Sequence, residues 1–183
     1  MRDPAARTAG LAAALAAFRP THVFALLGTT RARAAAAARE SAAPADYEAV
    51  DHGLSALLLR AAAAARAAGA PARFVYLSSL GATATGGNAY LRARGRVEAL
   101  MRESGLPYLI VRPAFISGPD REERRRLERL LARTTDWGTA LLAAFGATRL
   151  RARLRPHTAA ELAESMVRLA LSGREGVVES DEL

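Results

Sequence analysis

The stretch FVYLSSLGATATGGNAYLRAR, residues 74–94, decides the fold. Its apolar run ends at two serines, and a glycine-rich segment then leads to Asn88, a residue type that caps helices. The run predicts a buried strand over 73–78, and the segment after Asn88 predicts a helix that ends before Gly105. A buried strand that leads into a helix is the repeating unit of an α/β fold.

The same pattern repeats on both sides of this stretch. Further apolar runs predict strands over 22–28, 107–112 and 177–180, and further helices are predicted over 4–18, 46–68 and 158–172. The alternation predicts an α/β fold with a doubly wound parallel sheet. We expect a single domain over 1–183, in which 1–120 supply the strand and helix units and 121–183 are mostly helical.

The composition of the chain excludes several kinds of catalytic and structural site. The chain has 183 residues and a formal charge of +8, with arginine but neither lysine nor cysteine. The absence of lysine excludes lysine-based catalysis, and the absence of cysteine excludes disulfides and fits a cytoplasmic protein. The three histidines show no metal-ligand spacing, so no metal site is expected. No apolar segment is long enough to span a membrane, and LAAALAAF near the N-terminus suits an amphipathic helix better than a signal sequence.

Two phosphate-binding motifs can be tested directly. Gly81 and Gly86 have the spacing that opens a P-loop, but Gly87 and Asn88 stand where lysine and a hydroxyl residue are required. The dinucleotide fingerprint G-x-G-x-x-G does not occur in the chain. Nucleotide hydrolysis through a P-loop is therefore excluded.

A serine and a tyrosine offer a different chemistry. Ser79 ends a predicted strand, and Tyr90 lies in the first turn of the next helix, four residues before Arg94 on the same helix face. A fixed cation beside a tyrosine favours its phenolate, and a serine hydroxyl can hold a substrate oxygen. These residues form a coherent acid–base set for carbonyl reduction or alcohol oxidation. The alternative is that the serines only end a strand and Asn88 only caps a helix.

The basic segments 120–133 and 149–155 raise the question of nucleic-acid binding. No aromatic residues are interleaved with their arginines, so stacking platforms for bases are lacking. We therefore do not expect a nucleic-acid partner. A solvated helix over the sheet and an anionic small ligand are the remaining uses of this charge.

Four segments in order carry a family resemblance: VFALLGTTRARA, RFVYLSSLGA, YLRARGRVEALM and LIVRPAFISGP. They resemble the short-chain dehydrogenase superfamily, and in particular its atypical NAD(P)H-binding members. These are the NmrA-like proteins and the oxidoreductase related to the human Tat-interacting protein. The resemblance implies a Rossmann-like fold, NAD or NADP as cofactor, and oxidoreduction of a small carbonyl or alcohol. A non-catalytic dinucleotide-sensing or protein-interaction module of the NmrA-like type is the alternative.

The resemblance also implies roles for individual residues. Tyr90 would be the general acid or base, Ser79 would orient the substrate, and Arg94 stands where the family has lysine. Arginine keeps the positive charge but cannot relay a proton. Six residues from the ends of three predicted strands would border the cofactor: Gly28, Thr29, Thr30, Ser78, Arg112 and Pro113. Ser78 is also an alternative to Ser79 as the serine that orients the substrate.

The beginning of the chain departs from the family pattern. In the family, earlier strand units and a glycine-rich turn precede the segment that resembles residues 3–28. We therefore expect an N-terminally truncated or degenerate copy. Strand 22–28 would then be an exposed apolar sheet edge, through which copies of the chain can self-associate.

Overall fold

The structure is a computed structural model that describes residues 3–29, 47–117 and 154–183 of the chain. Four parallel strands form one sheet in the order β1–β2–β3–β6. Their bounds are His22–Ala25 for β1, Arg73–Leu77 for β2, Tyr108–Arg112 for β3 and Gly176–Glu179 for β6. The bounds of β2, β3 and β6 agree with the predicted strands within one residue, whereas β1 ends three residues earlier than predicted.

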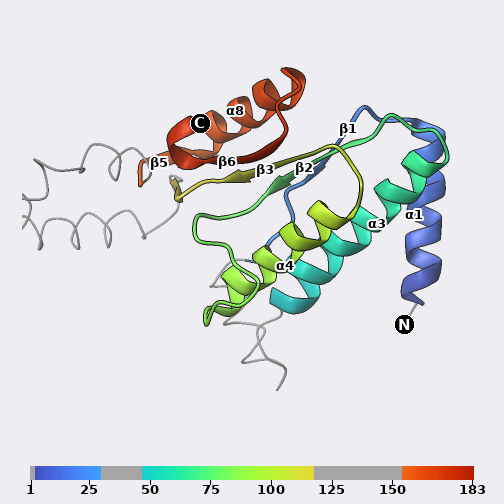
Figure 1. Cartoon of the computed structure of the whole chain (residues 1–183), viewed down its shortest axis with the longest axis horizontal. Helices are drawn as coiled ribbons and strands as arrows, with labels where there is room; N and C mark the ends of the chain where they lie inside the picture. The colour runs from blue at the N-terminus through green and yellow to red at the C-terminus, as the bar shows by residue number, and fades with distance from the viewer. Residues whose placement is uncertain (1–2, 30–46, 118–153) are drawn as a thin grey trace, which may run out of the picture.

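Helices cover both faces of this sheet (Figure 1). Helices α3 (Ser55–Ala67) and α4 (Ala89–Glu103) lie on one face, and α1 (Pro4–Phe18) packs against α3. Helix α8 (Ala159–Leu171) covers the other face. Within the described ranges, no helix combines the length and the apolar character that crossing a bilayer requires.

The middle strand β2 shows why its sequence is continuously apolar. Successive side chains of a strand point to opposite faces of the sheet. Phe74 and Tyr76 accordingly lie in the core beneath α3 and α4, while Val75 lies in the core beneath α8. All three residues are fully buried, which confirms the predicted buried strand.

Local capping sets where the helices begin. The carboxylate of Asp3 accepts a hydrogen bond from the Ala5 amide at 3.0 Å, directly before Pro4. The Asn88 side chain caps α4, and Thr158 with Glu161 forms a capping box at α8. These contacts satisfy amide groups that the helices leave unpaired, and they confirm the predicted helix starts.

Three features differ from the prediction or lie beyond it. The predicted helix 46–68 consists of a π-helical segment, η1 (Tyr47–Leu54), followed by α3. A second sheet pairs β4 (Phe115–Ser117) with β5 (Pro156–Thr158). The sequence does not predict these strands, because three residues are too few to show an alternating pattern of apolar and polar side chains. The basic segment 120–133 and most of 149–155 lie outside the described residues.

Strand β1 has a strand neighbour on one side only within the described part of the chain. Apolar side chains of β1 and of the residues that follow it are accessible: Phe24 is 37% exposed and Leu26 is 57% exposed. An unpaired edge with apolar side chains is a surface on which another strand can add.

Candidate functional site

The candidate site is centred on Arg94, at the carboxyl ends of β1 and β2. The side chain is almost fully buried, and its Nη1 donates a hydrogen bond to the carbonyl of Leu77 at the end of β2. Its Nη2 donates to the Leu27 carbonyl at 3.2 Å and to Oδ1 of Asp51 at 2.9 Å. Arg94 therefore connects helix α4 to the ends of two strands and to η1.

Tyr90 lies against this guanidinium. The Cζ atom of Arg94 is 5.1 Å from the centre of the Tyr90 ring, and it is 5.6 Å from the ring of Tyr76. The edge of Tyr47 meets Tyr90 with ring centres 5.6 Å apart. The spacing of four residues thus brings Tyr90 and Arg94 together as the sequence predicts, and the contact is a cation–π interaction.

The turn that follows β1 lies directly beside Arg94. A Cβ atom added to Gly28 would stand 2.3 Å from Nη2 of Arg94, so the guanidinium fits only against a glycine. The amide of Thr29 donates a hydrogen bond to Oδ2 of Asp51 at 2.9 Å. Gly28 and Thr29, predicted to border the cofactor, therefore adjoin the predicted proton-transfer residues. Thr30 lies outside the described residues.

The two serines after β2 have different environments. Ser78 is buried, and its hydroxyl donates a hydrogen bond to Oε1 of Glu98 at 2.6 Å. Ser79 is half-buried, and its hydroxyl makes no hydrogen bond to another described residue. Of the two serines, Ser78 has its hydroxyl engaged by Glu98.

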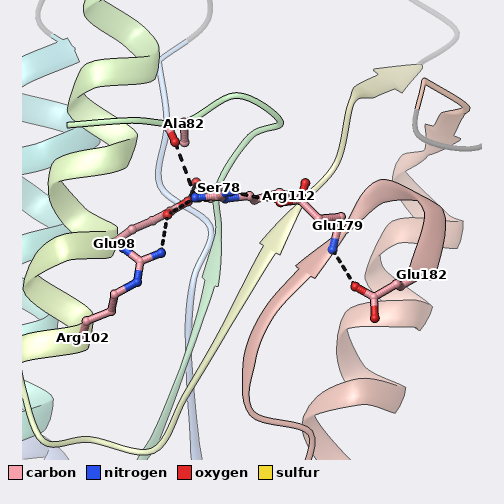
Figure 2. A network of polar contacts seen from close by, with 7 residues as sticks. All are labelled: Ser78, Ala82, Glu98, Arg102, Arg112, Glu179 and Glu182. Carbon is pink, nitrogen blue, oxygen red and sulfur yellow. Dashed lines mark hydrogen bonds and ion pairs between the residues drawn. The ribbon is translucent and has the colours of Figure 1, made fainter. Parts of the chain in front are cut away.

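Glu98 organises a second polar network at the ends of β2, β3 and β6 (Figure 2). The carboxylate is 1% exposed and accepts two hydrogen bonds from Arg112, at 2.9 and 2.5 Å. Arg102 pairs with it at 3.1 Å, and Arg112 also pairs with Glu179 at 3.0 Å. Arg112, predicted beside the cofactor, thus has its guanidinium directed into this network.

Pro113 lies at the same end of the sheet. The residue is buried, and its carbonyl accepts a hydrogen bond from the Leu80 amide at 3.0 Å. This bond joins the segment after β3 to the segment after β2. It holds the loop that begins at Ser79 against the end of β3.

Burial and pairing shift the protonation equilibria of both networks. Burial alone would raise the pKa of Glu98, but hydrogen bonds from Arg112 and Ser78 outweigh it and hold the pKa below its usual range. Burial lowers the pKa of Arg94, but Tyr76, Tyr90 and Asp51 raise it by more, so the guanidinium stays charged. Burial raises the pKa of Tyr76 well above its usual value, which keeps that phenol neutral.

Asp51 and Glu98, the carboxylates at the centre of the two networks, are not among the predicted site residues. Asp51 is fully buried, and it lies three and seven residues before Leu54 and Leu58, on the apolar side of the predicted helix. Glu98 lies next to Val97, in the middle of the buried side of α4. An acidic residue on an apolar helix face was the signal that could have identified both.

Two solved bacterial enzymes are similar to this chain. The Bordetella bronchiseptica enzyme WbmH, solved in complex with NAD+, is similar with a TM-score of 0.59 and 15% identity. The similarity covers 94% of this chain and 56% of WbmH, so the chain spans little more than half of that enzyme's length. WbmG of the same organism, solved in complex with NAD, has a TM-score of 0.42 and 22% identity over 61% of this chain and 36% of WbmG.

The likeness to WbmH shows the fold, a Rossmann-like α/β domain with a parallel sheet, as the sequence predicts. No curated protein matches the sequence. A family model described as NAD(P)H-binding matches residues 5–148. The match includes β1, β2, β3 and both polar networks except Glu179. The chain therefore belongs to the NAD(P)H-binding family, whose cofactor is NAD or NADP.

Proposed function

We propose that the chain is an NAD(P)-dependent oxidoreductase-like protein that acts on a small carbonyl or alcohol. The observation that carries the proposal is the contact between Arg94 and both Tyr90 and the turn at Gly28. It places the residues expected at the nicotinamide and the residue expected to move the proton around one buried cation. Ligands of open parallel sheets bind at this carboxyl end of the strands.

The residues present fit the nicotinamide end of such a cofactor. Gly28 is exposed, and because the Arg94 guanidinium fills the space where its side chain would stand, a ligand would reach the turn from its solvent side. Thr29 follows it, and the hydroxyl of Ser79 makes no bond to another described residue. We assign Gly28, Thr29 and Thr30 to the cofactor side and Ser79 to the substrate side.

In this proposal each protein group has one task. A bound nicotinamide supplies or accepts the hydride. Ser79 donates a hydrogen bond to the substrate oxygen, and Tyr90 gives that oxygen a proton during reduction or removes it during oxidation. Arg94 lies against the Tyr90 ring in a cation–π contact, which holds the ring beside the turn at Gly28. Asp51 keeps the guanidinium in place.

One observation favours a second candidate, a dinucleotide-sensing or protein-interaction module without turnover, of the NmrA-like type. The donors of Arg94 point into the protein. Nη1 and Nη2 bind carbonyls and Asp51, and Nε is buried without a described partner. An arginine used in this way serves the structure and offers no hydrogen bond to a ligand.

Two measurements separate the candidates. NADPH binding to the purified 183-residue chain is measured by calorimetry, and NADPH oxidation is followed with 4-nitrobenzaldehyde as a generic carbonyl probe. An oxidoreductase binds NADPH and oxidises it, and Tyr90→Phe removes turnover while binding stays within about twofold. A sensing module binds NADPH, and Tyr90→Phe changes neither quantity. No binding at millimolar NADPH refutes both the oxidoreductase and the dinucleotide-sensing module for this chain, and leaves the protein-interaction module.

A further inference from the structure

Asp51 is the least accessible charged residue in the described part of the chain, with an exposed fraction of 0%. It lies in the π-helical segment η1, and its carboxylate meets the turn after β1 and Arg94 of α4. π-Helical turns are rare and are frequently found at functional sites. The proposed reaction itself gives Asp51 no contact with substrate or cofactor.

Each oxygen of the Asp51 carboxylate binds a different half of the proposed site. Oδ2 accepts a hydrogen bond from the Thr29 amide at 2.9 Å, in the turn expected to border the cofactor. Oδ1 accepts one from Nη2 of Arg94 at 2.9 Å, on the helix that carries Tyr90. The same Nη2 atom also binds the Leu27 carbonyl of that turn at 3.2 Å. Carboxylate and guanidinium thus hold residues 27–29 from two sides.

We infer that Asp51 is a positioning residue that couples the turn 27–29 to helix α4, so that cofactor affinity depends on the Asp51–Arg94 pair. The inference rests on the proposed function for the identity of the ligand. The coupling itself is a property of the protein without a ligand.

Asp51 is the only carboxylate that pairs with Arg94 among the described residues. Arg94 Nε, Tyr76 Oη and Ser55 Oγ are buried and have no hydrogen-bond partner among the described residues. A buried guanidinium that loses its carboxylate remains charged, and its desolvation is then uncompensated. The side chain must move toward water, and because Gly28 lies directly against it, the turn must move as well.

Glu48 provides a matched control on the same element. Its carboxylate pairs with His52 and Arg96, both at 2.9 Å, but the side chain is 59% exposed. Glu48→Gln therefore removes one acidic charge from η1 without touching the turn or Arg94. Exposed pairs of this kind contribute little to stability.

The test without a ligand is amide hydrogen exchange of Thr29, measured by NMR on the full chain. We expect Asp51→Asn to accelerate exchange of the Thr29 amide at least tenfold, with β3 amides and Glu48→Gln unchanged within threefold. We expect Asp51→Asn to have less than a threefold effect when Arg94→Met is already present, because no buried cation then has to move. Unchanged Thr29 exchange in Asp51→Asn, or equal acceleration in β3, overturns the inference.

The double variant keeps the test valid if Asp51→Asn alone does not fold. The two substitutions together place an uncharged amide beside an uncharged thioether, and a protein interior tolerates such a pair better than an unpaired charge. Comparing the exchange rate of the Thr29 amide in Arg94→Met and in Arg94→Met/Asp51→Asn then decides whether Asp51 acts through Arg94. Tenfold faster exchange of Thr29 in the double variant would mean that Asp51 acts on the turn independently of Arg94, which overturns the coupling.

NADPH binding supplies the second readout. We expect Asp51→Asn to raise the NADPH Kd at least tenfold and Glu48→Gln to leave it within twofold. If the unaltered chain binds NADPH and Asp51→Asn binds it equally well, the inference fails and the proposed function stands. If the unaltered chain does not bind NADPH, the proposed function fails, and so does the inferred dependence of cofactor affinity on the Asp51–Arg94 pair. Exchange of the Thr29 amide then decides whether Asp51 couples the turn to helix α4.

Discussion

Replacement of Glu98 by glutamine tests the network that joins the three strand ends in Figure 2. The substitution keeps the size of the side chain and its hydrogen bond to Ser78, but it removes the charge that Arg112 and Arg102 share. Arg112 is then left partly unpaired in a site where Glu98 is 1% exposed. Breaking one partner of a buried ion pair costs about 3–5 kcal/mol.

The expected loss lies at the low end of this range. Arg112 keeps its second carboxylate, Glu179, at 3.0 Å, and the Arg102 side chain is 43% exposed, so its pair contributes little. We therefore expect about 3 kcal/mol of lost unfolding free energy. With a urea dependence of about 2 kcal/mol per molar, the unfolding midpoint falls by about 1.5 M.

The effect depends on pH in a defined direction. The pKa of Glu98 is lower in the folded chain than in the unfolded chain, so its stabilisation is complete above the unfolded value of about 4.3. It is lost as the pH falls through the lower folded value. The difference between the unaltered chain and Glu98→Gln should therefore be constant between about pH 6 and 8 and shrink below about pH 4.

Urea unfolding followed by circular dichroism at pH 7, 5 and 3.5 measures this difference. Glu175→Gln is the control, because it breaks the pair with Arg73 at a side chain that is 58% exposed and should change stability by less than about 1 kcal/mol. Equal effects of the two substitutions at pH 7 would refute the reasoning. So would a Glu98→Gln difference that stays the same down to pH 3.5.

Three local features give further expectations. Gly95→Ala places a Cβ 2.2 Å from the Thr83 backbone and should cost about 1–3 kcal/mol in urea unfolding. Gly10, in α1, has open space around it, so Gly10→Ala should instead stabilise the fold by about 0.5–1 kcal/mol. Changes in unfolding free energy of the same sign for the two glycine variants would contradict this. Thr158→Ala should remove about 1 kcal/mol through the lost capping box, and an unchanged Tm in calorimetry would argue against that cap. We also propose that the β1 edge pairs two copies of the chain; Phe24→Glu should then convert dimers to monomers in sedimentation, and a monomeric unaltered chain at high concentration would contradict it.

The elements that the sequence predicts well are those with local causes. Asp3, Asn88 and Thr158 cap helices through groups only two or three residues away, so their meaning is readable from neighbouring letters. The strands are equally readable, because burial on both faces requires continuous apolar runs such as Phe74–Tyr76.

The parts that the sequence does not predict depend on distant residues. Asp51 and Arg94 are 43 positions apart, and their contact requires the register of β1 against β2 and the π-helical turn of η1. Ser78 meets Glu98 for the same kind of reason, since helix α4 must first pack across the sheet. The shared helix face of Tyr90 and Arg94 was readable, but the direction of the guanidinium was not.

The strand order has a consequence for the chain as it is synthesised. The first three strands and their helices can form before the last strand β6 has been made, because each of them pairs with its neighbour in sequence. The outer edge of β3 gains its strand partner only when Gly176–Glu179 leaves the ribosome, and the apolar side chains of Leu109 and Val111 gain their cover only when α8 has been made. At about 5–20 residues per second, that edge stays open for several seconds. Slower translation of the C-terminal third therefore lengthens the period in which nascent chains can aggregate, and a ribosome-bound chaperone that covers β3 shortens it.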